Sequence, residues 1–514
     1  MNKLSYFYLN RRYQIFALAV FASVLLSWIV ISQQQPINRD GILYLNAAKA
    51  FAQEGVHAAQ TLYSWPFYSV IIASLATILP LSYLQSALVL NSLFIVLIIL
   101  GFIQLTKQLG ASERVQYIAG LIILLFPTLN KLRDSVIRDF GYWAFYLWGI
   151  ERLIAFAKKP SLMNLAFWNI SIITATLFRI EGAVFLLLMP FSLFLVTEYS
   201  WRQRIVLVIK LLLVPACLAL LLALLYLISH PSAHALGRIN ELLSGLSIYG
   251  IDNWEILQNR AASLGYDVLN QYSIEHAKWV LVGGLIALFL VELCNALGVV
   301  YLLMYLYSYR YLSGIIKLEY TARLIIYFAI IINFLILFAF IFHNAFLNSR
   351  YLMGLVLLLL LKIPFALDKI FVKRSWLNYL VILGLCALLV KSVVHFGHSK
   401  TYLVKAGNWL EQHTEPQAKI FSNSDILVFY ANRPDNQPEY DGSLAIESLT
   451  LDALSEYNYM AIRVTNEKMK QNLDLLEKKL NLQLVKSFKG DGVREVKIYK
   501  LYPRHKIQQN LNFQ

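Results

Sequence analysis

The feature that most constrains this sequence is the recurrence of apolar runs of about 20 residues, from 13–32 through to 376–394. A run of about this length spans the hydrocarbon core of a bilayer as a helix. Hydrophobic residues make up 58% of the 514 positions, more than in ordinary soluble domains. The runs therefore predict an all-α polytopic membrane bundle. We expect eleven spans, at 13–32, 84–106, 115–129, 140–157, 162–178, 183–199, 206–228, 279–306, 323–342, 351–367 and 376–394.

The basic residues are distributed unevenly among the loops between the apolar runs. Lysine and arginine give the chain a formal net charge of +15, and most of them lie in alternate short loops between the runs. Cytoplasmic loops carry such an excess, so the charge indicates a membrane orientation and no nucleic-acid partner. We expect a multi-pass protein of the inner (plasma) membrane with a cytoplasmic N-terminus. The first run follows Lys3, Arg11 and Arg12 and lacks a small-residue cleavage site, which predicts a retained helix.

The chain changes character near residue 396. Apolar runs shorten and charged residues become dense, so we expect a transmembrane domain over 1–395 and a soluble α/β domain over 396–514. An odd number of spans after a cytoplasmic N-terminus places this second domain outside the cytoplasm. Amphipathic and alternating patterns within it predict helices at 402–412 and 467–480 and strands at 418–422, 459–464, 483–488 and 495–499.

A polar stretch follows the first span, in a predicted outer loop over 33–83. It contains Asp40, which would lie near the N-terminus of a helix over 41–52, where a negative side chain is favoured. On such a helix Tyr44 and Ala48 share a face with Asp40. Two interpretations fit the spacing: Asp40 is the N-cap of an interfacial helix, or it is a catalytic carboxylate. The run 66–80 is too short to span and suits a helix in the interface.

This stretch also resembles a known family. Asp40-Gly41 with Tyr44, the alanines at 47, 48 and 50 and Phe51, followed by Trp-Pro-Phe at 65–67, is similar to the first outer loop of GT-C glycosyltransferases of family 39. These are the protein O-mannosyltransferases and the bacterial aminoarabinose transferases. The resemblance implies a GT-C-like bundle, an essential acid at Asp40 and a sugar donor carried on polyprenyl phosphate. Many members have a second acid where this chain has Gly41, so no second acid is assigned.

Further ionised groups fall at the predicted outer ends of spans. Arg138, Arg179 and Arg350 suit a phosphate because guanidinium is planar and weakly hydrated. An Arg-Tyr pair at the top of a span recurs in family 39, so Arg350 is the first choice for the donor phosphate, before Arg138 and Arg179. Structural alternatives are an i,i+4 pair of Asp134 with Arg138 and a tight charged turn at 179–182. Other candidate site residues are Tyr44, Asp139, Glu181, His343 and Tyr351.

His343 and Glu292 have an ordinary structural explanation as well as a functional one. His343 is as readily an ordinary loop histidine as a ligand. Glu292 lies inside an apolar run, where an acid is a functional candidate by default, but a polar partner in the bundle explains it equally well. It is therefore left out of the catalytic set. No cluster has metal-ligand spacing, and we expect neither a metal nor another cofactor.

These observations together predict a membrane glycosyltransferase. It would take a sugar from a polyprenyl-phosphate donor in the lipid bilayer and transfer it to an acceptor lipid, glycan or protein on the outer face. Asp40 would remove the acceptor's proton in a single inverting displacement, and the arginines would stabilise the leaving phosphate. Two alternatives stay open: a transporter or flippase of a lipid-linked glycan, and a non-catalytic subunit of cell-envelope assembly. The sequence does not show the paired halves or mirrored broken helices of many transporters, which weighs against the first alternative.

Overall fold

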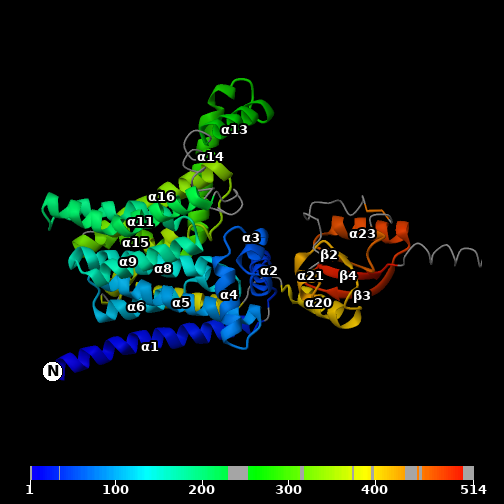
Figure 1. The fold of residues 1–514 in the computed structure, drawn as a ribbon, viewed down its shortest axis with the longest axis horizontal. Coiled ribbons are helices and arrows are strands. Elements are labelled where there is room, and N and C mark those ends of the chain that lie inside the picture. Colours follow the sequence, from blue (N-terminus) through cyan, green and yellow to red (C-terminus); the bar gives the residue numbers. More distant parts are fainter. Residues whose placement is uncertain are drawn as a thin grey trace, which may run out of the picture.

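The computed structural model describes residues 3–33, 35–229, 253–312, 318–372, 376–394, 399–433, 449–450 and 454–501. Figure 1 shows a bundle of helices with a small sheet domain beyond one end of it. The helices of the first part are α1 (Lys3–Ile31), α2 (Arg39–Glu54), α3 (Val56–Leu62), α4 (Phe67–Ile78), α5 (Tyr83–Gln108), α6 (Glu113–Leu124), α7 (Pro127–Asn130), α8 (Asp139–Lys158), α9 (Leu162–Phe178), α10 (Gly182–Leu188), η1 (Met189–Leu195), α11 (Trp201–Ser229), α13 (Asn253–Asp267), η3 (Ile274–His276), α14 (Ala277–Leu297), α15 (Val299–Leu312), α16 (Tyr320–Asn344), α17 (Met353–Leu360), α18 (Ile363–Val372) and α19 (Leu377–Val393).

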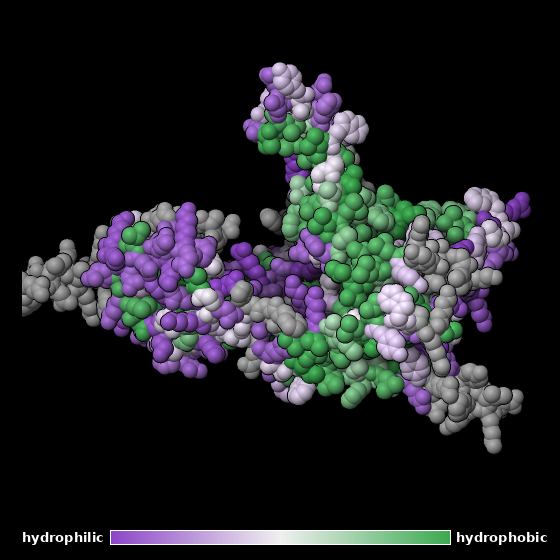
Figure 2. Space-filling model, turned by 180° about the vertical axis from the view of Figure 1, so that it is seen from behind, coloured by the Kyte–Doolittle hydropathy of each residue, from purple (hydrophilic) through white to green (hydrophobic). Residues whose placement is uncertain are grey.

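The bundle has the surface of a membrane protein. Figure 2 shows hydrophobic side chains over most of the bundle, whereas the sheet domain is mainly hydrophilic. An apolar surface of this extent is stable only against lipid. The predicted fold class, an all-α membrane bundle with a small C-terminal α/β domain, is therefore confirmed, while the count of eleven spans and the division at residue 396 stay predictions. Within the described chain, five helices are long and apolar enough to cross a membrane: Tyr13–Ile31, Tyr83–Gln108, Trp201–Leu221, Ile274–Leu297 and Tyr320–Asn344.

Four of the expected spans are not single helices. In the run 115–129, α6 ends at Leu124 and the short helix α7 begins at Pro127. Over 183–199, α10 passes into the 3-10 helix η1, where Pro190 has no amide hydrogen to donate. The run 279–306 is two helices, α14 and α15, separated by Gly298 with a φ of 73°. The run 351–367 divides into α17 and α18 just before Pro364. Apolar composition continues through each break, so hydropathy alone does not detect them.

Helix α8 is central to the bundle. It packs along α5 and α9, and its Trp143, Tyr146 and Leu147 side chains are buried. After α9 the chain turns sharply into α10, and Gly182 in this turn lies against Thr176: a Cβ on Gly182 would be 2.6 Å from the Thr176 backbone nitrogen. Small residues permit such close approaches between membrane helices. The packing at Gly182 thus fixes the turn that carries Arg179 and Glu181.

Within its described residues, the C-terminal domain is built as the sequence predicts, with one element more. All the predicted helices and strands are present, and α21 (Asp425–Tyr430) is additional. The sheet has the order β1-β2-β4-β3, in which β1 is parallel to β2 and the other pairs are antiparallel. Buried side chains of α20 and α23 pack on its opposite faces. The elements are α20 (Thr401–His413), β1 (Ile420–Ser422), β2 (Tyr459–Val464), α23 (Glu467–Leu480), β3 (Gln483–Lys489) and β4 (Glu495–Lys500).

This domain contacts the bundle through α21. The Tyr430 hydroxyl accepts a hydrogen bond from the Ile37 amide at 3.2 Å, just before α2. Arg39 Nε forms an ion pair with Asp425 at 2.8 Å, although the Arg39 side chain is 72% exposed. Exposed ion pairs contribute little to stability, so the half-buried tyrosine contact is the stronger restraint. The domain is therefore held against the helix that carries Asp40.

We expect Gly182→Ala to lower the thermal midpoint of the purified protein. The added Cβ would meet backbone atoms of Thr176, which cannot move aside, and overpacking of this kind costs about 1–3 kcal/mol. Gly283→Ala in α14 is the matched control, because a Cβ there has no atom within 4 Å. Its midpoint should stay the same or rise slightly. Equal midpoints for the two variants would contradict the tight packing at Gly182.

Candidate active site

A cluster of acids and arginines lies where several chain segments meet at one end of the bundle. This is the end beside α2 and the sheet domain in Figure 1. The cluster, defined here by its six charged side chains, draws on four separate parts of the sequence. They are Asp40 in the first turn of α2, Arg138 and Asp139 at the start of α8, Arg179 and Glu181 between α9 and α10, and Arg350 before α17.

Asp139 is the centre of the cluster. Its side chain is 1% exposed, accepts a hydrogen bond from Arg179 Nη1 and lies 3.6 Å from Arg350 Nε. On its other side, Arg350 Nη1 donates to Asp40 Oδ2 at 2.8 Å. Arg179 Nη2 likewise donates to Glu181 Oε1 at 2.5 Å. Opposite charges thus alternate from Asp40 to Glu181, as a buried carboxylate requires, because an unpaired one is very costly.

The three arginines differ in how much of their hydrogen-bonding capacity is free. Arg179 is buried and directs Nε, Nη1 and Nη2 at the carboxylates of Asp139 and Glu181. Arg350 is 23% exposed and its outer partner, Asp40, is 46% exposed. Arg138 makes no ion pair within the described ranges, and its buried Nη1 has no hydrogen-bond partner. Arg138 and Arg350 are therefore the arginines available to an anion, whereas Arg179 organises the cluster.

Aromatic rings surround the arginines. The Arg138 guanidinium lies 5.4 Å from the centre of the Tyr63 ring. Tyr63 and Tyr44 meet edge to face, with ring centres 5.3 Å apart. The Tyr351 ring lies 5.0 Å from the Arg179 guanidinium and 5.8 Å from that of Arg350. These contacts favour the charged form of arginine and fix the planes of the guanidinium groups.

The surroundings also shift the pKa of Glu181 within the cluster and of Tyr44 beside it. Loss of solvent would raise the pKa of the Glu181 carboxyl, but the Arg179 charge outweighs it and lowers that pKa from 4.5 to about 2. For Tyr44, burial dominates and raises the pKa of the phenol far above its ordinary range. Glu181 is therefore charged and Tyr44 neutral at physiological pH. Neither is suited to exchanging a proton there.

Asn38 fixes the start of α2, and sequence reasoning did not single it out. Its side chain donates to the Val136 carbonyl at 3.1 Å and accepts from the Val136 amide at 2.7 Å. The N-cap position of α2 is Asn38, and Asp40 bonds Arg350, so an N-cap role does not explain Asp40. A Cβ on Gly41 would lie 2.9 Å from that of Val136. A larger side chain, such as a second acid, therefore does not fit at this position unless its neighbours shift.

A cavity of about 690 Å³ lies beside Asp40. Its walls come from α2, the turn before α5 and α21 of the sheet domain, so the two domains form it jointly. Its volume is in the usual range for small-molecule sites. Polar and charged groups alternate with apolar ones around it. The polar lining residues are Arg39, Asp40, Asn46, Lys49, Ser82, Asp425 and Asn432, and the apolar ones include Ile42, Leu43, Leu45 and Phe429.

His343 and Glu292, which the sequence analysis also considered, lie outside the cluster. His343 lies half-buried in the last turn of α16. Glu292 of α14 accepts a hydrogen bond from the Ser349 hydroxyl at 3.1 Å, so this acid supports the segment that carries Arg350. Among the described residues, no group of three His, Cys, Asp or Glu side chains is arranged to hold a metal ion.

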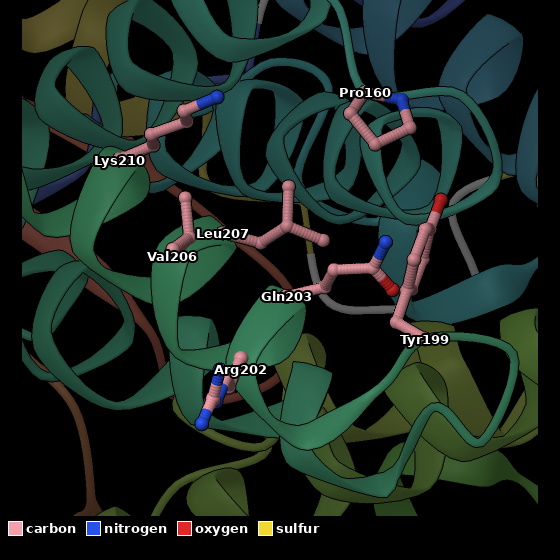
Figure 3. A pocket seen from close by; sticks show the side chains of 7 residues that line it. All are labelled: Pro160, Tyr199, Arg202, Gln203, Val206, Leu207 and Lys210. Carbon is pink, nitrogen blue, oxygen red and sulfur yellow. The ribbon is translucent and has the colours of Figure 1, made fainter.

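A second cavity, of about 350 Å³, lies at the opposite end of the bundle. It is formed by Pro160, Tyr199 and the first turns of α11. Figure 3 shows that the charged ends of its Arg202 and Lys210 side chains point in different directions. Both are exposed, and no carboxylate is found among the described lining residues. Without convergent polar groups this cavity is not a candidate active site.

Comparison with known proteins yields similarities of fold. Neither a protein-family model nor a curated protein matches the chain. A crystal structure of the Archaeoglobus fulgidus oligosaccharyltransferase tethered to an acceptor peptide is 14% identical, with a TM-score of 0.46 over 92% of this chain and 68% of that chain. ArnT from Cupriavidus metallidurans, bound to undecaprenyl phosphate, is 11% identical, with a TM-score of 0.42 over 94% of this chain and 98% of that chain.

We expect Glu181→Gln to reduce the acid sensitivity of the fold. A carboxyl whose pKa is lowered in the folded state, here to about 2 from 4.5, stabilises the protein above pH 4.5 and loses this contribution as the pH falls toward 2. Thermal midpoints measured between pH 7 and about pH 2.5 should therefore fall less steeply in the variant. Glu54→Gln, at an exposed position of α2, is the control and should keep the wild-type slope. An unchanged slope in Glu181→Gln would contradict the pairing with Arg179.

Proposed function

We propose that this protein is a membrane glycosyltransferase that transfers a sugar from a polyprenyl-phosphate carrier to an acceptor on the outer face of the membrane. The observation that carries the proposal is the meeting of Asp40 with Arg350. These residues are 310 positions apart, yet their side chains form an ion pair of 2.8 Å beside a cavity at one end of an apolar helical bundle. In the proposed reaction this pair would supply a base and an anion-binding group side by side at the membrane surface.

The proposed reaction is a single displacement with inversion at the anomeric carbon. Asp40 accepts the proton of the acceptor, whose oxygen or nitrogen attacks the sugar. The bond from the anomeric carbon to the phosphate oxygen breaks, and the carrier leaves as polyprenyl phosphate. Asp40 suits the role of base by its exposure and by its position on the cavity wall.

The phosphate of the donor would be bound by Arg350 and Arg138. Both lie at the end of the bundle beside the sheet domain, and each has donor capacity that an anion can take. Positive groups fixed in advance stabilise the charge that grows on a leaving phosphate, and the nearby apolar bundle strengthens this effect. Arg179, whose guanidinium is already bound to two carboxylates, would position the others.

The cavity suits the acceptor. It is bounded by α2 on one side and by α21 of the sheet domain on the other, so the sheet domain would take part in acceptor binding. Lys49 and Arg39 on its wall offer hydrogen bonds to hydroxyl or acidic groups. We expect no metal to take part, because the arginines supply the positive charge that the leaving phosphate needs.

Asp40→Asn should abolish most of the transfer activity while leaving the fold intact. The variant keeps the size of the side chain but cannot accept a proton, and loss of a positioned base costs about 10²–10⁴-fold in rate. Transfer of labelled sugar from a polyprenyl-phosphate donor is the measurement, with thermal melting to confirm folding. Asp368→Asn is the control, since Asp368 pairs with Arg114 away from the cluster. A folded Asp40→Asn protein with wild-type turnover would refute the catalytic role.

The proposed orientation has its own test. If the cluster faces the outside of the cell, the sheet domain beside it does too, and a reporter fused after Gln514 should be active outside the cytoplasm. The lysines of the opposite end, such as Lys158 and Lys210, should then face the cytoplasm. A reporter active in the cytoplasm would show that the cluster faces inward, against a reaction on the outer face.

A further inference from the structure

We propose that Arg350 is exchanged between Asp40 and the donor phosphate, so that binding of the donor is the event that frees Asp40 to act as the base. This inference rests on the proposed function and adds an order of binding to it. Without the donor, the Asp40 oxygen that would accept a proton is occupied by Arg350 Nη1 at 2.8 Å. An acceptor that arrived first would therefore meet a carboxylate that is already engaged.

The two carboxylates beside Arg350 are unequal. Asp139 is 1% exposed and is also held by Arg179, so it stays in place. Asp40 is 46% exposed, and Arg350 is the partner that the described structure gives it. Exposed ion pairs shift an equilibrium by only about 1.5- to 5-fold. The inner contact of Arg350 is therefore fixed, whereas the outer one is easily replaced.

A phosphate is a strong competitor for the outer contact. It can accept two parallel hydrogen bonds from one guanidinium, and charge-assisted bonds of this kind are about twice as strong as neutral ones. Arg138 stands in the same cluster, and among the described residues its buried Nη1 has no hydrogen-bond partner, so the phosphate would gain a second arginine. An anion arriving here would thus satisfy Arg138 and take Arg350, while Asp40 turns to the cavity that it lines.

The exchange also accounts for release of the product. After transfer the proton is on Asp40 and the phosphate oxygen carries the electron pair of the broken bond. A protonated, neutral Asp40 does not compete for Arg350, so the polyprenyl phosphate stays bound. Once Asp40 loses its proton to solvent, the carboxylate competes for Arg350 again and displaces the carrier. Asp40 would then reset the site as well as accept the proton.

The test is a double-mutant cycle on the binding of undecaprenyl phosphate. The full-length protein in lipid nanodiscs is titrated with this probe as wild type, Asp40→Asn, Arg350→Ala and the double variant. We expect Asp40→Asn to bind about 1.5- to 5-fold more tightly, since its competition for Arg350 is gone. Arg350→Ala should bind about 10- to 100-fold more weakly. In the Arg350→Ala background, Asp40→Asn should bring no gain.

The other possible results of the double-mutant cycle would overturn either the exchange of Arg350 or the proposed function. Unchanged or weaker binding by Asp40→Asn would overturn the exchange, and so would an equal gain in both backgrounds, which would indicate general charge repulsion. If Arg350→Ala does not fold, Arg350→Lys replaces it in the cycle, with an intermediate loss of affinity. Asp368→Asn should bind as the wild type does. Failure of the wild type to bind the probe would overturn the proposed function itself, whereas binding without the predicted coupling would overturn the exchange alone.

Discussion

The end of the bundle beside the sheet domain depends on the buried charge of Asp139. This carboxylate opens α8, the central helix, and at 1% exposure it could not remain ionised alone. Arg179 reaches it from the end of α9, and Arg350 reaches it from the loop before α17. Three segments distant in the sequence are therefore fixed relative to one another by one ionised group. A shift of any of these segments would break an ion pair of Asp139. The contacts that hold the helices together are therefore also the contacts that set the geometry of the site.

The position of a group in this chain of charges decides what chemistry is open to it. Asp40, Asp139 and Glu181 carry the same functional group. Asp139 is bound on both sides, and Arg179 keeps the pKa of Glu181 near 2, so these two remain charged and occupied. Asp40 lies at the exposed end and has one partner. The same reasoning separates Arg179, which is fully engaged, from Arg138 and Arg350.

Sequence reasoning was most successful where pattern and structure are local. The long apolar runs predicted the membrane bundle, and alternating or amphipathic patterns predicted the strands and helices of the C-terminal domain. The breaks at Pro190 and Gly298 were missed because hydropathy continues across them. The six-residue helix α21, which closes the cavity beside Asp40, is too short to leave a periodic signal.

The residues of the candidate site could be selected from the sequence, but their contacts could not be predicted. Asp40 and Arg350 could be selected by residue type and by the predicted outer side, but their contact is a product of tertiary packing across 310 positions. Sequence reasoning put Arg350, Arg138 and Arg179 in one category of phosphate ligands. Whether Arg179 is occupied depends on Glu181 and on a turn whose tightness rests on Gly182 against Thr176. Asn38 gives no signal in the sequence, because its partner is the backbone of Val136, which is 98 positions away.

The balance of charge explains how such a site can be both stable and responsive. Three acids and three arginines make up the cluster, so its charges offset one another when no ligand is bound. A bare cluster of arginines would repel itself and would need an anion to fold. In this cluster the charges of the three arginines are already balanced by the three acids. A phosphate that binds an arginine would therefore have to displace one of the acids from it. Because the exposed Asp40 is the acid most easily displaced, charge balance would direct the ligand to the one carboxylate of the cluster that lines the cavity. Arg39 and Lys49 on the cavity wall could offset the negative charge that the ligand adds.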